Sequence, residues 1–351
     1  MLMHTCALEN WSIAVTIKDI AKVAGVSHST VSRALREHPA IAPDTIIRIK
    51  QHAEDLGYVP SAVARGLKTN RSNALGVIIS RIDDPYFSEI LQAIDDESQA
   101  AGYSLFVAAD NRDLERLETI IQTMSERRVD GIIVCSGNVT AEHGRQLQQH
   151  GIPIVAVDNQ TIEDYQYSIS HDHYFGSLQL TQHLIDLGHK KIGYIGNPRS
   201  SRANRDRQKA FVDTMTQAGA PVPSSYIFNG PNGRLDGGEA GGDYFFALPD
   251  TPTAMICFND LMAIGLMHVF RERNFSVPND CSVVGFDNIA ISAYTTPPLS
   301  TFEQPKYELG YAAARMMMSL LNKELPGDQA TKTEILRGTV ILRESTAPPK
   351  S

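Results

Sequence analysis

The chain has 351 residues, of which 42% are hydrophobic and 21% charged, and this composition predicts a globular protein of two or three compact units. Its first 15 residues lack a basic segment followed by an apolar one, and no stretch of about 18 uninterrupted apolar residues occurs, so neither export nor a membrane partner is expected and the predicted location is the bacterial cytoplasm. The four cysteines are scattered without a CxxC pair, which predicts reduced thiols.

The net charge of −8 argues against bulk nucleic-acid binding, but this charge is unevenly distributed. Residues 1–72 carry nine Lys and Arg against six Asp and Glu, a net charge of +3, which leaves −11 for the remainder. A basic head on an acidic body is expected when only the head meets phosphates. Such an asymmetry can also arise by chance, so the charge distribution alone is weak evidence for DNA binding.

The segment TIKDIAKVAGVSHSTVSRAL, residues 16–35, predicts two short helices joined by a tight turn. Thr16, with Asp19 three residues later, is a capping-box start. Gly25 can adopt the left-handed conformation that ends a helix, and Ser27 can cap the next one. Two helices with so short a connection cross steeply, as in a helix-turn-helix whose second helix enters the DNA major groove.

The outer face of the second helix carries small polar residues and an arginine. Arg33 can pair bidentately with guanine, whereas serine and histidine are less selective readers of base edges. A helical hairpin used only for packing is the alternative, and it is disfavoured because this face gathers the residue types that base contacts need. Base contacts are therefore predicted at His28, Ser29, Ser32 and Arg33.

A third helix is predicted from Pro43 or Asp44 to a stop at Gly57, and the three helices make a small closed bundle. The next segment, SAVARGLKTNRSN, predicts a helix of about eight residues, too short to persist in water unless something holds it. Its basic residues suit phosphates, and Leu67 suits a wedge between base steps in the minor groove. Taken alone, the segment favours an ordinary solvated linker.

From Ala74 onward, apolar runs of strand length alternate with amphipathic helical windows. Continuous apolar strands separated by helices indicate parallel sheets covered on both faces. The number of alternations predicts an α/β core of two doubly wound lobes. The predicted strands are ALGVIIS, YSLFVA, GIIVC, IPIVAV, KKIGYIG, AMICF and SVVGF.

Polar residues follow several of these strands, at the edge where parallel sheets bind their ligands. Two aspartates offer acceptors for hydroxyl groups, an asparagine offers a donor and an acceptor, and an arginine adds a fork of donors. With two aromatic residues behind the first strand, this mix predicts a polyhydroxylated small molecule between the lobes, although each residue alone is as well explained as a strand-end cap. These residues are Tyr86, Phe87, Asp158, Arg207, Asn259 and Asp287.

Other chemistry is sparse. No GxGxxG follows the first strand, and neither GxxxxGK[ST] nor GxSxG occurs, which disfavours a dinucleotide, P-loop or serine-hydrolase enzyme. The HDH run at His171 to His173 is the one metal-like cluster, but it lacks a partner motif, and no metal site is predicted. We expect no cofactor and no enzymatic activity.

Many segments of the chain follow one known pattern in order: TIKDIAKVAGVSHSTVSRAL, LGYVPSAVARGLKT, ALGVIISRIDDPYF, VDGIIV, GIPIVAVDN, LGHKKIGYIGN, FNDLMAIG, SVVGFDN and LRES. Through them the chain resembles the LacI/GalR family, the lactose- and galactose-repressor type of bacterial transcription regulator, over residues 16–346. The resemblance implies a DNA-binding head, a hinge helix that orders in the minor groove, and a two-lobed core of the periplasmic-binding-protein type that dimerises and binds an effector.

We expect four segments along the chain. Residues 1–15 precede the usual start of the family, so they are either a disordered extension or a start-site artefact. The head spans residues 16–60, the hinge helix and linker 61–73, and the core 74–346. Within the core, one lobe is expected at about 74–170 and 303–332, and the other at about 171–302 and 333–346.

The family's functional positions can be placed on this chain. Its groove-reading positions fall on His28, Ser29 and Arg33, its wedge leucine on Leu67, its effector arginine on Arg207, its strand-end aspartates on Asp158 and Asp287, and its Asn-Asp pair on Asn259 and Asp260. The full set of candidate DNA contacts is Thr16, Ser27, His28, Ser29, Thr30, Ser32, Arg33, Ser61, Ala64, Arg65, Leu67 and Lys68. The candidate effector contacts are Tyr86, Phe87, Asp158, Arg207, Asn259, Asp287 and Gln304.

Two further departures from the family matter. The glycine-rich NGPNGRLDGGEAGGDYF leaves open which residue occupies the family's aromatic effector position, and the end TAPPKS lacks a leucine heptad, so a homodimer rather than a tetramer is expected. The predicted function is repression of carbohydrate uptake or catabolism genes, through double-stranded operator DNA on the nucleoid and a sugar-like effector that controls hinge-helix folding. The alternatives are a solute-binding protein of a sugar transporter, or a regulator of the same family that senses a nucleobase or nucleoside.

Overall fold

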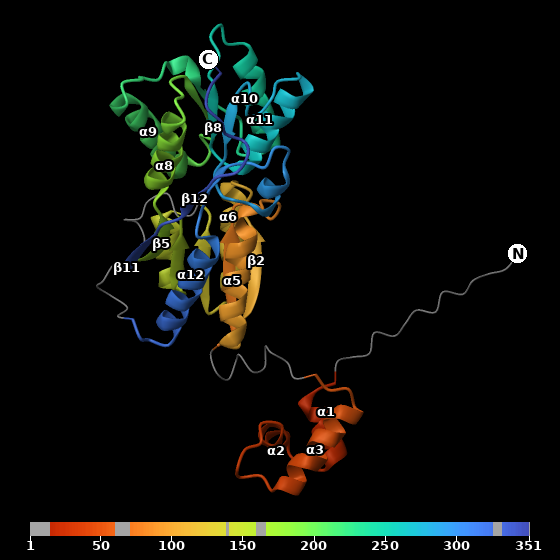
Figure 1. Ribbon diagram of the computed structural model, residues 1–351. Coiled ribbons are helices and arrows are strands. Elements are labelled where there is room, and N and C mark those ends of the chain that lie inside the picture. Colours follow the sequence, from red (N-terminus) through yellow and green to blue (C-terminus); the bar gives the residue numbers. More distant parts are fainter. Residues whose placement is uncertain (1–14, 60–70, 138–139, 159–165, 326–331, 351) are drawn as a thin grey trace, which may run out of the picture. The chain divides into compact units, whose positions relative to one another are not determined.

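The computed structural model describes residues 15–59, 71–137, 140–158, 166–325 and 332–350. They belong to two units, residues 1–70 and 71–351, and each unit is described by itself (Figure 1). Among the described residues, no helix is long and apolar enough to cross a membrane.

The first unit is a bundle of three short helices, as predicted. The backbone N–H and hydroxyl of Thr16 donate to the Asp19 carboxylate at 2.9 and 2.6 Å, and Ser27 Oγ accepts from the Thr30 N–H at 3.2 Å. Gly25 ends the first helix with a φ of 67°, where a side chain would be strained. The helices are α1 (Ile17–Ala24), α2 (His28–Ala34) and α3 (Pro43–Asp55).

The first lobe of the second unit is a parallel sheet of six strands in the order β11-β5-β4-β3-β1-β2, with helices on both faces. The strands are β1 (Ala74–Ile79), β2 (Ser104–Ala109), β3 (Gly131–Cys135), β4 (Ile154–Val157), β5 (Tyr167–His171) and β11 (Lys332–Leu336). The helices are α5 (Tyr86–Ala100), α6 (Leu114–Glu126), α7 (Ala141–Gln149) and α12 (Lys306–Leu321).

The second lobe repeats this plan on a parallel sheet of four strands in the order β7-β6-β8-β9. Its strands are β6 (Ile192–Gly196), β7 (Ile227–Asn229), β8 (Ala254–Cys257) and β9 (Ser282–Val284), and its helices are α8 (His173–Asp186), α9 (Ser201–Gln217), α10 (Leu235–Phe246) and α11 (Asp260–Glu272). A separate antiparallel pair joins β10 (Thr301–Glu303) to β12 (Thr339–Ile341). The short 3₁₀ helices are η2 (Ser224–Tyr226) and η3 (Ala290–Tyr294).

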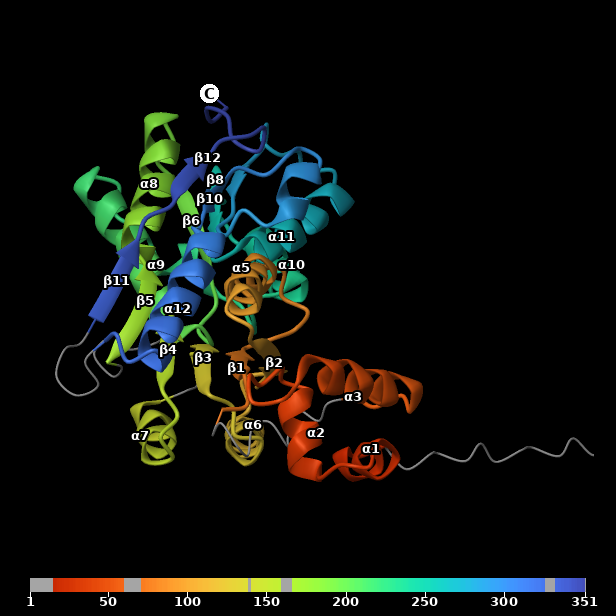
Figure 2. The ribbon, with the colours of Figure 1, turned by 90° about the horizontal axis from the view of Figure 1, so that it is seen from below.

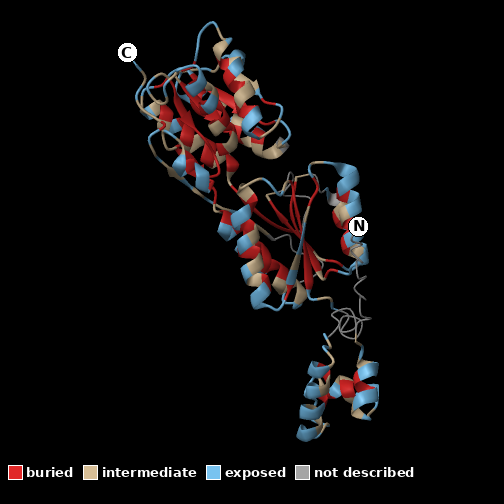
Figure 3. Cartoon of the chain, turned by 90° about the vertical axis from the view of Figure 1, so that its right-hand side faces the viewer, coloured by how far each residue is buried: buried red, intermediate tan, exposed pale blue. Residues whose placement is uncertain are grey.

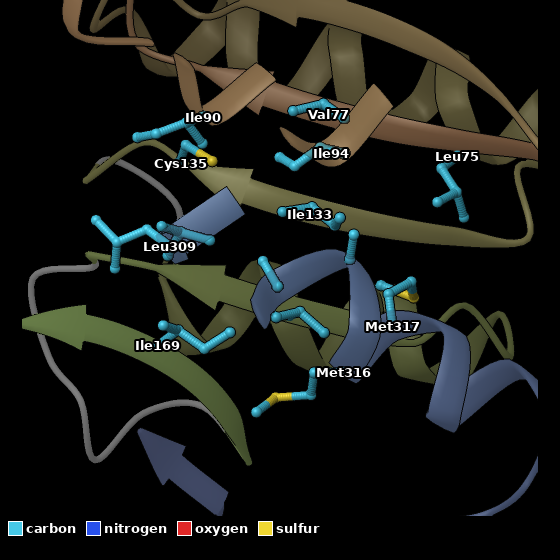
Figure 4. Packing of buried hydrophobic residues seen from close by; sticks show 14 of the residues in the cluster. Leu75, Val77, Ile90, Ile94, Ile133, Cys135, Ile169, Leu309, Met316 and Met317 are labelled. Carbon is cyan, nitrogen blue, oxygen red and sulfur yellow. The ribbon is translucent and has the colours of Figure 1, made fainter. Parts of the chain in front are cut away.

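Each sheet is buried between two layers of helices whose outer faces are exposed (Figure 3). Side chains alternate along a strand. Val77 of β1 therefore packs under α5 and α12, whereas the next residue, Ile78, packs under α6 and α7. Figure 4 shows the first of these clusters, with Met316 and Met317 of α12 against the strands. The predicted α/β fold of two doubly wound lobes is confirmed.

The described chain passes between the two lobes at three places. It leaves β5 for α8 at residues 171–173, leaves β10 for α12 at residues 303–306, and leaves β11 for β12 at residues 336–339. The first lobe therefore contains α12, which lies beside α5 (Figures 1 and 2). A ligand at these crossings would contact both lobes.

One expected lobe boundary is wrong. We expected residues 333–346 in the second lobe, but β11 pairs in parallel with β5, so residues 332–336 complete the sheet of the first lobe. The chain changes lobe only after Leu336, before β12 pairs with β10. The short, polar sequence KTEIL carries no signal of its own for this pairing, which is determined by the exposed edge of β5.

Gly310 provides a test of the packing between α12 and α5. A Cβ at this buried position would lie 2.3 Å from the carbonyl oxygen of Ile90 and 3.0 Å from the side chain of Ala93, so the two helices would have to separate. We expect Gly310→Ala to lower the free energy of unfolding by about 1–3 kcal/mol, despite the better helix propensity of alanine. Urea unfolding measures this, with exposed Arg315→Ala on the same helix as the control; equal stability of Gly310→Ala and wild type would contradict the packing.

Candidate functional site

Helix α2 presents one polar face to solvent. Val31 and Ala34 are buried against the other helices, whereas His28, Ser29 and Arg33 on the opposite face are exposed. The predicted base-reading residues are therefore available to a partner along one side of the helix, beginning at its N-terminal turn. This is the end that a recognition helix turns toward base edges.

Several candidate DNA contacts are already used within the head. Ser27 Oγ lies 2.8 Å from Ser29 Oγ and 2.9 Å from Thr30 Oγ1, which makes Ser27 and Thr30 part of the helix cap. Ser32 Oγ accepts from Arg36 Nη2 at 2.9 Å. This bond places the guanidinium of Arg36, which was not among the predicted DNA contacts, beside α2. Among the described residues, Arg33 has no such side-chain partner and remains free for a base.

The candidate hinge contacts lie outside the described residues. They are Ser61, Ala64, Arg65, Leu67 and Lys68. The chain is described again from Arg71, where it enters the first lobe. There the backbone N–H groups of Ser72 and Asn73 donate to the two carboxylate oxygens of Asp130 at 2.8 and 3.0 Å, and Arg71 Nη2 donates to the Leu321 carbonyl at the end of α12 at 2.9 Å.

Between the two lobes lies a cleft of about 650 Å³, lined by residues from both. Strand β4 of the first lobe and β8 of the second each end at this cleft, as parallel sheets require of a ligand site. All seven candidate effector residues line the cleft: Tyr86, Phe87, Asp158, Arg207, Asn259, Asp287 and Gln304.

Arg207 of α9 is a buried cation at the wall of this cleft, with 4% of its surface exposed. Its guanidinium carbon lies 3.6 Å from the ring centroid of Phe286 and 4.6 Å from that of Phe258, and Nη1 donates to the Phe258 carbonyl. Nε and Nη2 approach His173 Nδ1 at 3.4 and 3.3 Å. The nearest carboxylate oxygen, Asp287 Oδ1, is 3.9 Å away, so the charge is held mainly by aromatic rings and neutral acceptors.

Asp287 is held by groups from the second crossing. Gln304 Nε2 donates to Asp287 Oδ1, and Lys306 Nζ donates to the Asp287 carbonyl at 2.7 Å. The buried ammonium of Lys306 also lies 3.3 Å from Glu89 of α5. Burial raises the pKa of Asp287 well above its usual value, although Arg207 opposes this, so the carboxyl tends to hold a proton and can donate as well as accept.

Asp158 lies against two histidines. Its Oδ2 is 3.0 Å from His171 Nδ1, and its Oδ1 is 3.3 Å from His173 Nε2. Burial alone would raise the pKa of Asp158, but His171 and His173 outweigh this and hold it well below the usual value. Burial, reinforced by His171, lowers the pKa of His173 to about 3, so an ionised carboxylate faces a neutral imidazole.

The rim of the cleft joins the two lobes through residues that sequence reasoning missed. Arg112, after β2, donates to the Arg199 carbonyl and, at 2.8 Å, to the hydroxyl of Ser200 in the second lobe. Asp83 lies 3.7 Å from Arg234 in the glycine-rich segment. Arg112 could have been found from the sequence, because it belongs to the polar run DNRD that follows the predicted strand YSLFVA. No aromatic residue from 229–246, all of them described, lines the cleft.

Comparison with known families places both units. Residues 16–61 match the model of bacterial regulatory proteins of the lacI family, and residues 181–346 match that of the periplasmic binding protein-like domain.

Known proteins resemble most of the chain. It is 35% identical over 303 residues to the HTH-type transcriptional repressor PurR of Actinobacillus pleuropneumoniae, covering 86% of this chain and 90% of that one. It is 33% identical over 311 residues to the catabolite control protein A of Priestia megaterium, covering 88% and 93%. Among solved structures, a Lac repressor dimer bound to operator and the anti-inducer ONPF matches with a TM-score of 0.83 and 26% identity, over 95% of this chain and all of that one.

Asp260, next to the cleft residue Asn259, provides a pH test of the region behind the site. Its carboxyl is fully buried and accepts from the hydroxyl of Thr301 at 2.6 Å and from the Ile289 N–H at 2.8 Å. Burial raises its pKa from 3.8 to about 7, against these donors and against Lys306 and Arg343. Between these two pH values the folded state keeps a proton that the unfolded state releases, so this group makes stability fall as pH rises.

We therefore expect Asp260→Asn to reduce the loss of stability between pH 4 and pH 7, because the variant has no carboxyl to ionise there. Urea unfolding at several pH values measures the slope. Asp186→Asn, at an exposed position on α8, is the control and should keep the wild-type slope. The assignment fails if Asp260→Asn and wild type lose stability equally across this range.

Proposed function

The chain belongs to the LacI family of bacterial regulatory proteins, and on this premise we propose that it is a ligand-controlled repressor that binds an operator as a homodimer. The observation that carries the proposal is the combination, in one chain, of an exposed reading face on α2 with a two-lobed cleft lined by all seven candidate effector residues. Each half of this combination would be ambiguous without the other.

On the DNA side, Arg33 makes the main base contact, and His28 and Ser29 tune which operator is chosen. The support is their exposure on the outer face of α2 and the free guanidinium of Arg33 in the described head. The hinge segment, residues 61–73, orders in the minor groove with Leu67 as its wedge. Binding depends on salt because phosphates are neutralised by the basic head.

On the ligand side, the effector is a sugar or sugar derivative. The support is the set of acceptors and donors at the strand ends, Asp158, Asn259, Arg207 and Asp287, which suits several hydroxyl groups. The described glycine-rich segment offers no aromatic side chain to cover a planar base from the second lobe. A nucleobase or nucleoside is the second candidate, favoured by relatives named PurR and by the aromatic pair Tyr86 and Phe87.

Helix α12 connects the two sides within the second unit. Its first residue, Lys306, donates to the Asp287 carbonyl in the cleft, and its last residue, Leu321, accepts from Arg71, near the C-terminal end of the hinge segment. A helix of 16 residues is about 24 Å long and nearly rigid. An effector that changes the angle between the lobes therefore moves this helix, and with it the base of the hinge segment.

Two other classes of function are less well supported. A solute-binding protein of a transporter shares the lobes, but it does not need a helix-turn-helix head. An enzyme would need an activated group in the cleft, and burial raises the pKa of Cys135, a cysteine that lines it, so its thiol stays protonated. The regulator accounts for both units of the chain.

Arg33 provides a test of the DNA side. An operator selected from random duplexes with the full chain should bind steeply less well between about 50 and 200 mM salt. Arg33→Ala should weaken binding by about 1–3 kcal/mol and relax the base preference at one position of each half-site. Fluorescence anisotropy measures both effects. Arg48→Ala on α3 is the charge-matched control, which should leave base preference unchanged; an unchanged preference in Arg33→Ala would remove Arg33 from base reading.

Arg207 provides a test of the ligand side. A thermal-shift screen of sugars, sugar phosphates and nucleobases identifies a ligand through the rise in melting temperature that binding causes. Arg207→Ala should weaken that ligand at least about tenfold, because a donor fork at the cleft wall is lost. Arg205→Ala, on the exposed face of the same helix, should bind as wild type does, and circular dichroism verifies folding. Equal affinities of Arg207→Ala and wild type would place the ligand elsewhere.

A further inference from the structure

Three residues that could ligate a metal converge beside the first crossing between the lobes. His171 is the last residue of β5 in the first lobe, His173 is the first residue of α8 in the second, and Asp158 follows β4. One ligand atom from each lies within 4.8 Å of the others. The intervening Asp172 is turned away, since its carboxylate caps α8 and approaches Arg337.

The His171 ring lies close to Asp158 without a hydrogen bond between them. His171 is 1% exposed, and among the described residues neither of its ring nitrogens has a hydrogen-bond partner, although Nδ1 is 3.0 Å from Asp158 Oδ2. A buried imidazole with two unsatisfied nitrogens costs free energy unless another group satisfies it. The rings of His171 and His173 meet edge to face, with centroids 3.8 Å apart.

These distances suit a shared ion. Two ligand atoms, each about 2.0–2.1 Å from a tetrahedral Zn²⁺, are about 3.3 Å apart. The short separations from Asp158 are 3.0 Å from Oδ2 to His171 Nδ1 and 3.3 Å from Oδ1 to His173 Nε2, and the His171 nitrogen has no hydrogen-bond partner among the described residues. Two imidazoles and a carboxylate select borderline transition metals such as Zn²⁺ and Co²⁺ over Mg²⁺ and Ca²⁺, which prefer oxygen ligands.

We propose that Asp158, His171 and His173 form a binding site for a divalent transition-metal ion at the wall of the cleft. Asp158 and His173 line the cleft, whereas His171 lies behind them, so the three ligands leave a coordination position that faces the cleft. Water or a ligand oxygen completes the site. Because His171 ends an element of one lobe and His173 begins an element of the other, the ion fixes the first crossing.

Metal binding also involves Arg207. His173 Nδ1 now faces the guanidinium at 3.3 and 3.4 Å, which requires a lone pair on Nδ1. When Nε2 of a neutral imidazole coordinates a metal, Nδ1 carries the proton and cannot accept. Arg207 must then turn from His173, and Asp287, 3.9 Å away, is the acceptor within reach. The ion thereby changes the position of the candidate effector arginine.

Metal binding itself does not depend on the proposed function; only the regulatory consequence, a change in effector affinity, rests on it. The binding test therefore uses no DNA and no effector. If the chain binds the ion but no operator, the repressor proposal fails and the metal site stands. If the chain binds an operator but no ion, the metal site fails and the repressor proposal stands.

The test uses the full chain without an affinity tag, stripped of metal by a chelator and titrated with Co²⁺, whose visible absorption reports coordination by nitrogen and oxygen. We expect saturation at one equivalent, displacement by Zn²⁺ and no displacement by Mg²⁺. His171→Asn and His173→Asn should each weaken binding at least about 100-fold, since the loss of a group that only orients a metal ligand already costs about 10- to 100-fold. His268→Asn, at an exposed position on α11, is the control and should bind as wild type does.

Thermal unfolding without metal verifies that each variant folds, and Asp158→Asn carries the test if a histidine variant does not. Zn²⁺ should raise the melting temperature of wild type and His268→Asn but not that of the site variants. The proposal is overturned if wild type shows no stoichiometric Co²⁺ absorption, or if the folded site variants bind Co²⁺ as tightly as wild type, which would assign the signal to surface histidines.

Discussion

Burial of the Arg207 guanidinium is the constraint around which the cleft is organised. A cation with 4% exposure must be compensated by its neighbours, because removal from water is costly. The neighbours here are two aromatic faces, a carbonyl, an imidazole and a distant carboxyl, none of which neutralises the charge fully. A ligand with acceptor oxygens would complete this environment, which explains why the cleft gathers acceptors and donors from both lobes.

The second layer of the cleft connects this charge to the rest of the core. Gln304 and Lys306 hold Asp287 from the second crossing, and His173 holds Arg207 from the first. Both crossings are thus tied to the same two side chains, Arg207 and Asp287. Helix α12 begins at Lys306 and ends at Leu321, whose carbonyl accepts from Arg71. A rearrangement at the cleft can therefore displace the C-terminal end of the hinge segment through this helix. These contacts connect the cleft to the hinge segment physically, and the coupling free energy between the two must be measured.

Local patterns made the head and the list of cleft residues predictable, whereas pairing between distant segments did not. The capping pair Thr16 and Asp19 and the exposed face of α2 follow from spacing within 20 residues. Six of the seven cleft residues could be named because carboxyl ends of parallel strands gather at one edge, whereas Gln304 was named only after the family resemblance. Strands β5 and β11 escaped prediction because YSISH and KTEIL are short and polar, and it is pairing with distant segments, β5 with β4 and β11 with β5, that makes them strands. For the same reason the HDH run could not be linked to Asp158, which the neighbouring strand β4 brings to it.

The central claim is that a ligand in the cleft alters DNA binding by the head. The direct measurement is operator affinity of the full chain at fixed salt, with and without a ligand whose saturation of the cleft is verified independently by calorimetry. We expect the ligand to change operator affinity by about 5- to 150-fold, in either direction, the range typical of coupling between two sites. A ligand that saturates the cleft yet leaves operator affinity unchanged would contradict the account.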